Sequence, residues 1–139
     1  MILFLDIDGV LSFDGKTFPS YTINNLHKCL GIIENPRIVL SSRWRLNPDW
    51  KKDLMAASHN PYWVSRVVDT TPVVFGSREH EIAAWLMDHP TSHYVIVDSC
   101  AIPSNHLVKT NPSVGLDSKT ALRLSLTVQQ LREKYDGSV

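Results

Sequence analysis

Three short apolar segments of this sequence each end abruptly in acidic or hydroxyl side chains. The segments are residues 2–7, 36–42 and 93–99, and the polar residues at their ends are Asp6 and Asp8, Ser41 and Ser42, and Asp98 and Ser99. Short apolar runs without polar alternation are typical of strands that are buried on both faces. Such strands occur in parallel sheets that helices cover on both sides. The segments therefore predict an α/β fold with a mostly parallel central sheet.

Helical patterns occupy the stretches between these strands. Residues 19–35 carry apolar side chains three and four positions apart, the spacing of one helix face. Further helices are predicted over residues 47–58, with Asn47 as N-cap and Pro48 in first position, over 77–89, with Ser77 as N-cap, and from Asp117 onward, with Ala121, Leu124, Val128, Leu131 and Tyr135 on one stripe. One or two short strands, interrupted by Pro72, are predicted over residues 64–75, and another over 105–110. This alternation predicts a three-layer, Rossmann-like fold in a single domain over residues 1–139.

The composition excludes several classes of protein. Fourteen basic and fourteen acidic residues cancel, whereas a domain that binds nucleic acid through charge alone is far more basic. No apolar run reaches the ~18 residues of a membrane span, and the N-terminus lacks the basic start of a signal peptide. Cys29 and Cys100 have no CxxC spacing and are expected to be small buried side chains in a reducing compartment. We therefore expect a cytoplasmic protein with no membrane partner.

The polar strand ends are expected to form one site. In open parallel sheets, ligands bind outside the carboxyl ends of the strands, so Asp6, Asp8, Ser41 and Asp98 are predicted to lie close together. A calcium loop counted from Asp6 is excluded, because it requires glycine in its sixth place and glutamate in its twelfth, where this chain has leucine and threonine. One or two carboxylates and a substrate phosphate are instead what Mg²⁺ takes. The sequence therefore predicts a magnesium site at this edge.

The same residues provide the groups that phosphoryl transfer requires. An ionised Asp6 beside Mg²⁺ is able to attack phosphorus and form an aspartyl-phosphate. Asp8 is expected to protonate the leaving oxygen and then to deprotonate the attacking water. The Ser41 hydroxyl and the Ser42 backbone N–H are candidate donors to the phosphoryl oxygens. Arg78 stands at a predicted helix start, which disfavours a cation unless an anion lies nearby, so it is a candidate phosphate ligand.

The ordered set of motifs resembles the haloacid dehalogenase (HAD) superfamily, whose members are mostly phosphatases and phosphotransferases. The matching features are "LFLDIDGVL", "IVLSS", the arginine at a predicted helix start, and "YVIVDS". The resemblance implies that Asp6 is the nucleophile and that Asp8 is the acid/base and binds Mg²⁺ through its backbone carbonyl. It also implies that Ser41 and Arg78 hold the phosphate and that Asp98 is the remaining metal ligand.

Two residues depart from the superfamily's pattern. Many members have a second acid directly after the residue that matches Asp98, and here that residue is Ser99. This change predicts either a weaker metal site or a water in place of the lost ligand. Arg78 replaces the commoner lysine, and the two cations are not interchangeable.

The spacing of the motifs bears on the substrate. The short connections leave no room for a separate cap domain, and an uncapped site suits bulky or macromolecular phosphoesters. The runs "LSSRWR" and "GLD" also resemble the small HAD domains associated with Swiss Army Knife RNA repair proteins, which implies a phosphorylated RNA or DNA end (a 3′-phosphate) or a nucleotide as substrate. Residues 37–52 add five basic residues and two tryptophans, a combination that binds a phosphate backbone and stacks bases. In the alternative interpretation, these tryptophans belong to the core and the cations are solvated.

Two other functions stay open from the sequence. Asp69 as acceptor with Lys109 would suit a receiver-type phosphoacceptor domain, although the first acids of such domains are normally adjacent and Pro72 follows closely. Ser99 in place of an acid would suit a catalytically idle HAD fold that serves as a binding module. No motif indicates a protein partner or selects one physiological substrate.

Overall fold

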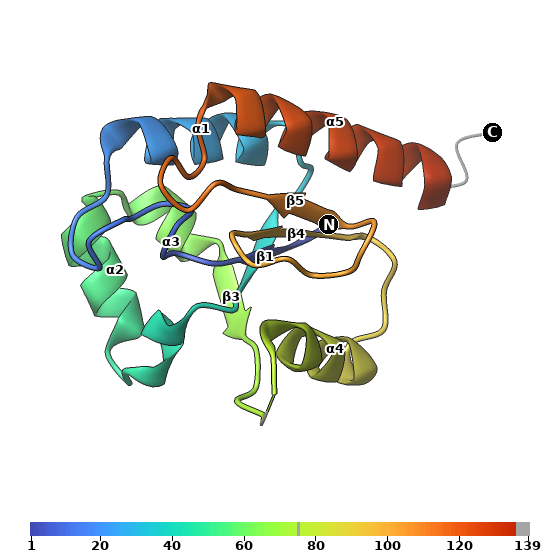
Figure 1. The fold of residues 1–139 in the computed structure, drawn as a ribbon, viewed down its shortest axis with the longest axis horizontal. Coiled ribbons are helices and arrows are strands. Elements are labelled where there is room, and N and C mark those ends of the chain that lie inside the picture. Colours follow the sequence, from blue (N-terminus) through green and yellow to red (C-terminus); the bar gives the residue numbers. More distant parts are fainter. Residues whose placement is uncertain (75, 136–139) are drawn as a thin grey trace.

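A computed structural model describes residues 1–74 and 76–135 and contains a five-stranded sheet (Figure 1). Its strands are β1 (Ile2–Leu5), β2 (Arg37–Leu40), β3 (Val67–Thr70), β4 (Tyr94–Asp98) and β5 (Leu107–Lys109). The strand order is β3-β2-β1-β4-β5, and every neighbouring pair is parallel. The predicted α/β class is therefore confirmed.

Helices cover both faces of the sheet, which gives the three layers that the alternating pattern predicts. They are α1 (Ser20–Gly31), the 3-10 helix η1 (Arg43–Leu46), α2 (Trp50–Ser58), α3 (Pro61–Ser65), α4 (Arg78–Asp88) and α5 (Ser118–Tyr135). In Figure 1, α1 and α5 lie above the sheet and α4 lies below it. Between the first acidic motif and α4 the chain forms only sheet strands, loops and these helices, so the described residues contain no separate cap domain.

Strand β1 is buried on both faces, which explains its uninterrupted apolar run. Successive side chains of a strand point to opposite faces. Leu3 and Leu5 therefore join the core that includes residues of α1 and α5, whereas Ile2 and Phe4 join the core that includes α4. Phe4 packs edge-on against Trp85 of α4, with ring centroids 5.3 Å apart. The residues that follow β1 thus start from a rigid central strand.

The helix predicted over residues 47–58 begins later, at Trp50. Asn47 is not its N-cap but follows η1, and its side-chain oxygen accepts a hydrogen bond of 3.0 Å from the Asp49 backbone N–H. The Asn47 amide also donates to Asp53 at 2.9 Å. An Asn-Pro pair suits a turn as well as a helix start. Here the local side-chain bonds select the turn, so the prediction of the cap was wrong.

Other predicted boundaries also move. The first strand ends at Leu5 rather than at residue 7. Residues 64 and 65 belong to α3, β3 is the strand that follows them, and residue 75 lies outside the described residues. Cys29 is buried as predicted, but Cys100 is exposed, in the loop after β4. Burial was inferred for both thiols from residue type alone, and the loop position overrides that preference.

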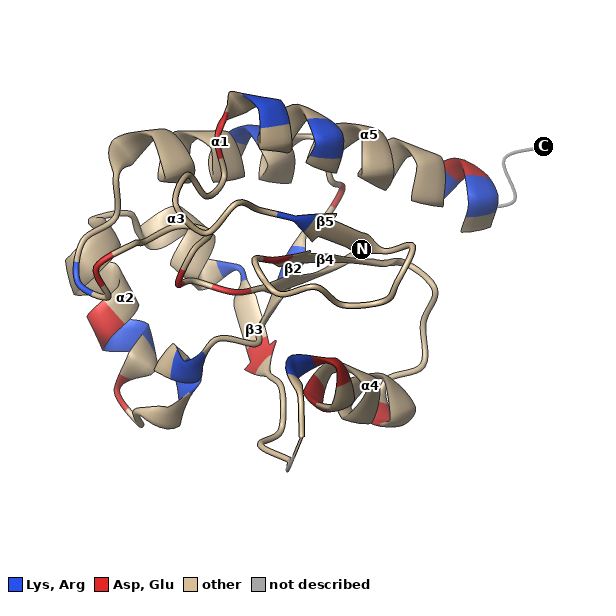
Figure 2. Cartoon of the chain, viewed as in Figure 1, with Lys and Arg blue, Asp and Glu red and all other residues tan. Residues whose placement is uncertain are grey.

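The basic and aromatic stretch over residues 37–52 does not form one continuous surface, and charges of both signs are interspersed in this region (Figure 2). Arg37 begins β2, at the amino edge of the sheet. Arg45 is buried, with 5% of its side chain exposed. Trp44 and Trp50 are partly buried and pack against the core. The exposed basic residues of this stretch outside the sheet are Arg43, Lys51 and Lys52.

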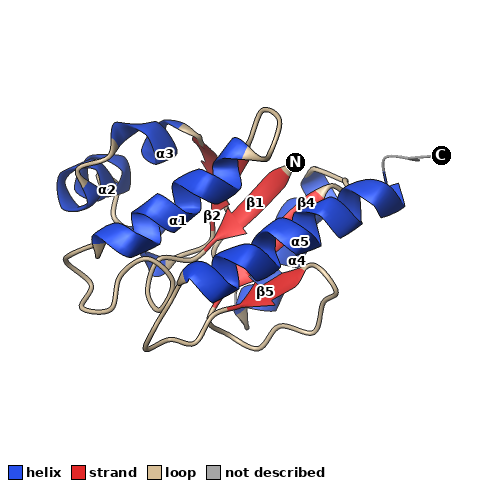
Figure 3. Cartoon of the chain, turned by 90° about the horizontal axis from the view of Figure 1, so that it is seen from above, coloured by secondary structure: helices blue, strands red, loops and turns tan. Residues whose placement is uncertain are grey.

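The longest helix, α5, packs beside α1 across one face of the sheet (Figure 3). Asp117 precedes it and accepts a hydrogen bond of 2.8 Å from the Thr120 backbone N–H, which supports the predicted start of the helix. Its predicted stripe is buried as far as Leu131, and Tyr135 is partly buried against the same core. Within the described part of the chain, no helix combines the length and the apolar character that crossing a membrane requires.

Candidate active site

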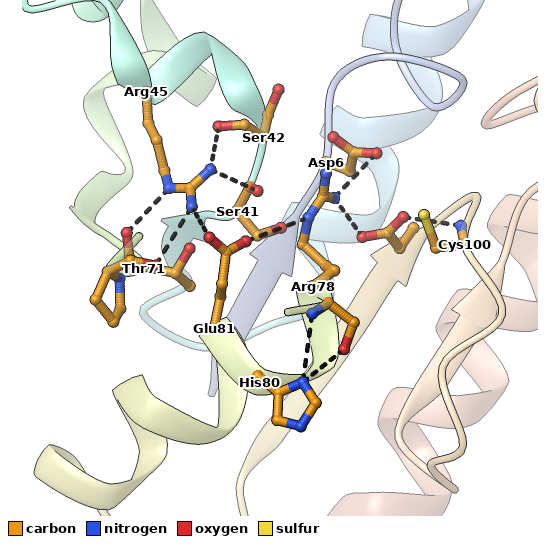
Figure 4. A network of polar contacts seen from close by, with 12 residues as sticks. Asp6, Ser41, Ser42, Arg45, Thr71, Arg78, His80, Glu81 and Cys100 are labelled. Carbon is orange, nitrogen blue, oxygen red and sulfur yellow. Dashed lines mark hydrogen bonds and ion pairs between the residues drawn. The ribbon is translucent and has the colours of Figure 1, made fainter. Parts of the chain in front are cut away.

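Two buried carboxylates and one guanidinium meet at the carboxyl edge of the sheet (Figure 4). Nη1 of Arg78 lies 3.2 Å from Oδ2 of Asp6 and 2.7 Å from Oδ2 of Asp98. Asp6 follows β1, Asp98 ends the neighbouring strand β4, and Arg78 is the first residue of α4. The structure thus brings together three residues that the sequence predicts for the site, although they are far apart in the chain.

The glycine of the first motif is required by a tight turn after β1. The Ile7 carbonyl accepts hydrogen bonds from three backbone N–H groups that follow it, at 2.8–3.1 Å. Gly9 has φ +79°, and a Cβ at this position would lie only 2.9 Å from Oγ of Ser99. The Gly9 carbonyl in turn accepts a hydrogen bond of 2.8 Å from the Thr110 hydroxyl. A larger residue would be strained and would collide with the loop after β4. Glycine therefore allows the loop that follows β1 and carries Asp6 and Asp8, the acidic loop, to lie close to its neighbours.

The environment of Asp6 disfavours its charged form. Burial, reinforced by the nearby Asp98 carboxylate, raises the pKa of Asp6 to about 6. The Arg78 charge and the Ile7 backbone N–H, which donates to Oδ1 of Asp6 at 2.8 Å, act in the opposite direction. Because two carboxylates share one guanidinium nitrogen, their negative charge is only partly balanced. The cluster is therefore suited to accept further positive charge.

The paired oxygens match the ligands that Mg²⁺ takes in proteins. Mg²⁺ is usually bound by one or two carboxylates, by water and by substrate phosphates rather than by an all-protein cage. Asp6 and Asp98 supply two carboxylate oxygens that converge on one point. Among the described residues, no three His, Cys, Asp or Glu side chains converge as a complete metal site. Asp6 and Asp98 are therefore the side chains available to hold such an ion here.

The Asp8 carboxylate is bound by η1 rather than by Arg78. Nε of Arg43 donates to its Oδ2 at 2.9 Å, and Nε1 of Trp44 donates to its Oδ1 at 3.3 Å. Neither donor was predicted as a site residue, because their contacts with Asp8 span 35 and 36 positions of the chain. The available signal was the run "SSRWR", which places these donors directly after the predicted strand end.

The two serines that follow β2 have different environments. Ser41 is fully buried, and its hydroxyl has no hydrogen-bond partner among the described residues. Its backbone N–H donates to the Leu5 carbonyl at 3.1 Å, which places Ser41 beside the start of the acidic loop. The Ser42 hydroxyl instead accepts a hydrogen bond of 3.2 Å from the Trp44 N–H at the start of η1. A buried, unpaired hydroxyl is costly until a ligand satisfies it, so Ser41 is the better candidate for contact with an anion.

Arg45 links three segments around the site and was not predicted. Its guanidinium donates to four backbone carbonyls and to the Glu81 carboxylate; the carbonyls are those of Ser41, Ser42, Thr71 and Pro72 (Figure 4). The bond to Glu81 is 2.7 Å long, and the other oxygen of Glu81 lies 3.9 Å from Nε of Arg78. Arg45 therefore ties the loops after β2 and β3 to the first turn of α4, which carries Arg78.

Asp69 and Lys109 do not form a phosphoacceptor site. Asp69 lies in β3 and accepts a hydrogen bond of 2.8 Å from Nε1 of Trp85, whereas Lys109 ends β5. Strands β3 and β5 are the opposite edges of the sheet. Four strand spacings of ~4.8 Å separate them by roughly 19 Å. The receiver-type interpretation is therefore contradicted.

A comparison against known families matches most of the chain. The family described as the HAD domain in Swiss Army Knife RNA repair proteins matches residues 2–121. The chain belongs to this family. The comparison found no match among curated proteins and none among solved structures. The matched part of the HAD domain contains all five strands and every predicted site residue from Asp6 to Asp98.

Proposed function

We propose that this HAD domain is a Mg²⁺-dependent phosphatase that hydrolyses phosphate monoesters through an aspartyl-phosphate on Asp6. The observation that carries the proposal is the Arg78 nitrogen shared by Asp6 and Asp98. A guanidinium recognises phosphate oxygens through several hydrogen bonds. A buried carboxylate beside such a group is well placed to attack a phosphorus atom that the guanidinium holds.

The residues of the chain divide the reaction between them. Oδ2 of Asp6 attacks phosphorus, and the bond from phosphorus to the leaving oxygen breaks. Asp8 donates a proton to that oxygen and later takes one from the water that hydrolyses the aspartyl-phosphate, which restores Asp6. Arg78 and the unpaired hydroxyl of Ser41 bind the phosphoryl oxygens throughout, and the Ser42 backbone N–H assists them.

Magnesium belongs to this proposal because of the charge balance around Asp6. We expect Mg²⁺ to be held by the Asp6 and Asp98 carboxylates and by the backbone carbonyl of Asp8. When bound, the ion supplies the positive charge that offsets the phosphate and the two carboxylates. Burial raises the pKa of Asp6, and a bound cation would act in the opposite direction and favour the ionised form that attacks phosphorus.

The proposed substrates are phosphorylated ends of RNA or DNA, with a 3′-phosphate favoured. The family description supports this choice because it places such domains in RNA repair proteins. The absence of a separate cap among the described elements also supports it, because an uncovered edge accepts the end of a long chain. Free nucleotides are the smaller members of the same substrate class.

Phosphate release from a panel of substrates tests the proposal. The panel contains RNA and DNA oligonucleotides phosphorylated at the 3′ or the 5′ end, nucleotides and sugar phosphates, each with and without Mg²⁺. We expect Mg²⁺-dependent release with a preference for 3′-phosphorylated ends, and no release by Asp6→Asn. Turnover of sugar phosphates alone would contradict the nucleic-acid part, and no turnover of any substrate would favour the idle binding module.

A further inference from the structure

A pocket of about 360 Å³ lies beside the acidic loop, next to η1 and the start of α2. It is lined by Gly15, Arg43, Trp44, Asn47 and Asp53. Its volume falls within the range of pockets that bind small ligands, roughly 300–1,000 Å³. The proposed catalytic groups leave this pocket without a role, and its Arg43 and Trp44 belong to the basic and aromatic stretch over residues 37–52.

The pocket adjoins the acid/base rather than the phosphate-binding cluster. Arg43 and Trp44 line it, and the same two side chains donate hydrogen bonds to the Asp8 carboxylate. Asp6 contacts Arg78 instead. In the proposed reaction, Asp8 protonates the leaving oxygen, so the leaving group lies on the side of Asp8. The pocket is therefore placed to receive the leaving group.

The walls of the pocket are held in place before any ligand binds. In the turn that contains Gly15, the Asp14 carboxylate accepts hydrogen bonds of 2.8–2.9 Å from the backbone N–H groups of Lys16 and Thr17. Trp44, another lining residue, packs edge-on against Phe18, with ring centroids 5.6 Å apart. A preorganised wall loses little conformational freedom when it orders a ligand, which favours binding.

The lining combines one aromatic ring, one cation, an amide and the Asp53 carboxylate, which accepts a hydrogen bond from that amide. Trp44 offers a ring on which a nucleobase stacks. Arg43 is 77% exposed and uses Nε for Asp8, while its terminal nitrogens have no partner among the described residues. Acidic neighbours such as Asp49 and Asp53 offset the nearby lysines, so no long basic track continues from the pocket. This balance suits one nucleoside and one adjoining phosphodiester rather than a long strand.

We propose that this pocket binds the nucleoside whose phosphate is removed, with its base against Trp44 and the next phosphodiester of the strand against Arg43. The inference rests on the proposed function and defines its substrate: the enzyme recognises a terminal dinucleotide and does not follow the strand further.

Three substrates with increasing contact to the pocket test this inference. They are phenyl phosphate, a uridine monophosphate, and a uridine dinucleotide with the same terminal phosphate, each nucleotide prepared in its 3′ and its 5′ form. We expect KM to fall about tenfold when the base is added, which corresponds to one stacked base. We expect a further fall with the dinucleotide and no additional fall for a longer oligonucleotide.

A pair of matched glycine variants localises the effect. Gly15 has φ +71°, which asparagine tolerates, and no atom lies within 4 Å of a Cβ built there, so Gly15→Asn adds bulk at the pocket wall. We expect it to reduce the preference for uridine monophosphate over phenyl phosphate about tenfold. Gly31→Asn, also at an open position but at the end of α1, should keep the preference of the wild type.

Arg43→Gln separates the phosphodiester contact from the base contact. We expect the dinucleotide to lose its advantage over the mononucleotide in this variant. The dependence of its KM on salt should also weaken by about 0.7 in a double logarithmic plot, the value for one phosphate contact on a single strand. Because both substrates need the same Asp8, the ratio of their KM values isolates the pocket from the chemistry.

A binding measurement distinguishes failure of this inference from failure of the proposed function. The unphosphorylated dinucleotide UpU should quench tryptophan fluorescence in the wild type and not in Trp44→Phe. Quenching without phosphate release from any substrate would overturn the proposed function and leave the pocket assignment standing. Equal KM values for phenyl phosphate and the nucleotides, or a preference for phosphotyrosine peptides, would overturn the pocket assignment alone.

Discussion

Asp6 combines two demands that oppose each other. The proposed nucleophile must be ionised, yet this carboxylate is buried beside a second carboxylate and shares its guanidinium partner. Burial and the Asp98 charge raise the pKa of Asp6 to about 6, so the metal-free protein loses stability when this group ionises. A group that destabilises the folded protein in this way is expected where activity requires it.

Asp6→Asn is therefore expected to remove activity while it stabilises the metal-free protein at neutral pH. The folded-state pKa of Asp6 is raised from 3.8 to about 6, so the wild type loses stability as pH rises through this window, whereas asparagine stays neutral. At ~1.4 kcal/mol per pKa unit, the difference in the free energy of unfolding between the variant and the wild type should grow by about 3 kcal/mol as pH rises past 6. Urea unfolding of both proteins in EDTA at several pH values measures it. A constant gap from pH 4 to pH 7 would contradict the argument.

At Asp8, the indole N–H of Trp44 is expected to orient the proposed general acid. Trp44→Phe keeps an aromatic ring but removes the donor at 3.3 Å, so proton transfer to the leaving oxygen should weaken. We expect kcat for phenyl phosphate to fall about tenfold, and kcat for p-nitrophenyl phosphate to change much less, because its leaving group needs no proton. Asp8→Asn should show the same pattern with a larger loss. An equal loss for both substrates would indicate a structural effect instead.

At the scale of secondary-structure elements, η1 supplies the contacts that the sequence did not predict. A four-residue 3-10 helix is too short to show periodicity, and its position depends on partners far along the chain. Arg43 points to Asp8, whereas Arg45, two residues later, is saturated by carbonyls and by Glu81. The two arginines look equivalent in the sequence. Only their distant partners show that Arg43 makes an exposed contact and that Arg45 makes buried hydrogen bonds.

The two arginines are accordingly expected to differ in their contribution to stability. Arg45→Met removes the donor of the half-buried Glu81 carboxylate and of several carbonyls, which should cost about 3 kcal/mol in the free energy of unfolding. Arg43→Met, the matched control, removes an exposed pair and should cost less than about 1 kcal/mol. Urea unfolding at neutral pH compares them. Equal losses in the free energy of unfolding would mean that Arg45 does not stabilise the packing of the loops after β2 and β3.

The elements that pattern alone predicts are those whose burial follows a regular period. Strand β1 is apolar on both faces because it is central, and α5 carries a stripe of buried residues, so both were expected from the sequence. The same reasoning placed Asp6, Ser41 and Asp98 at one edge, because the carboxyl ends of parallel strands coincide. The start of α2 and the partners of Asp8 were missed, because side-chain hydrogen bonds rather than periodic burial determine them.

At the scale of the whole molecule, the site lies at the central strand, from which the following strands are added first on one side of the sheet and then on the other. Strand β1 is central, with β2 on one side and β4 on the other, so the loops after these three strands meet at one edge of the sheet. Gly9, against Ser99 and Thr110, packs the first of these loops onto the loops after β4 and β5. Arg45 does the same for the loops after β2 and β3. The rigid sheet and these two ties hold the site in place before substrate binds.

Magnesium binding to Asp6 and Asp98 is expected to stabilise the whole domain, because the unfolded chain does not hold these two carboxylates together. A ligand at one hundred times its dissociation constant adds about 2.7 kcal/mol, which corresponds to a rise in Tm of roughly 8 °C for a chain of this length. In Asp98→Asn, which lacks one of the two proposed side-chain ligands, the rise should shrink to a small fraction of that value. Asp88→Asn, at the exposed end of α4, is the matched control and should keep the full rise. The comparison uses the shift in Tm between EDTA and Mg²⁺ for each protein, so any change in the metal-free Tm cancels. An undiminished shift in Asp98→Asn would place the ion elsewhere in the molecule.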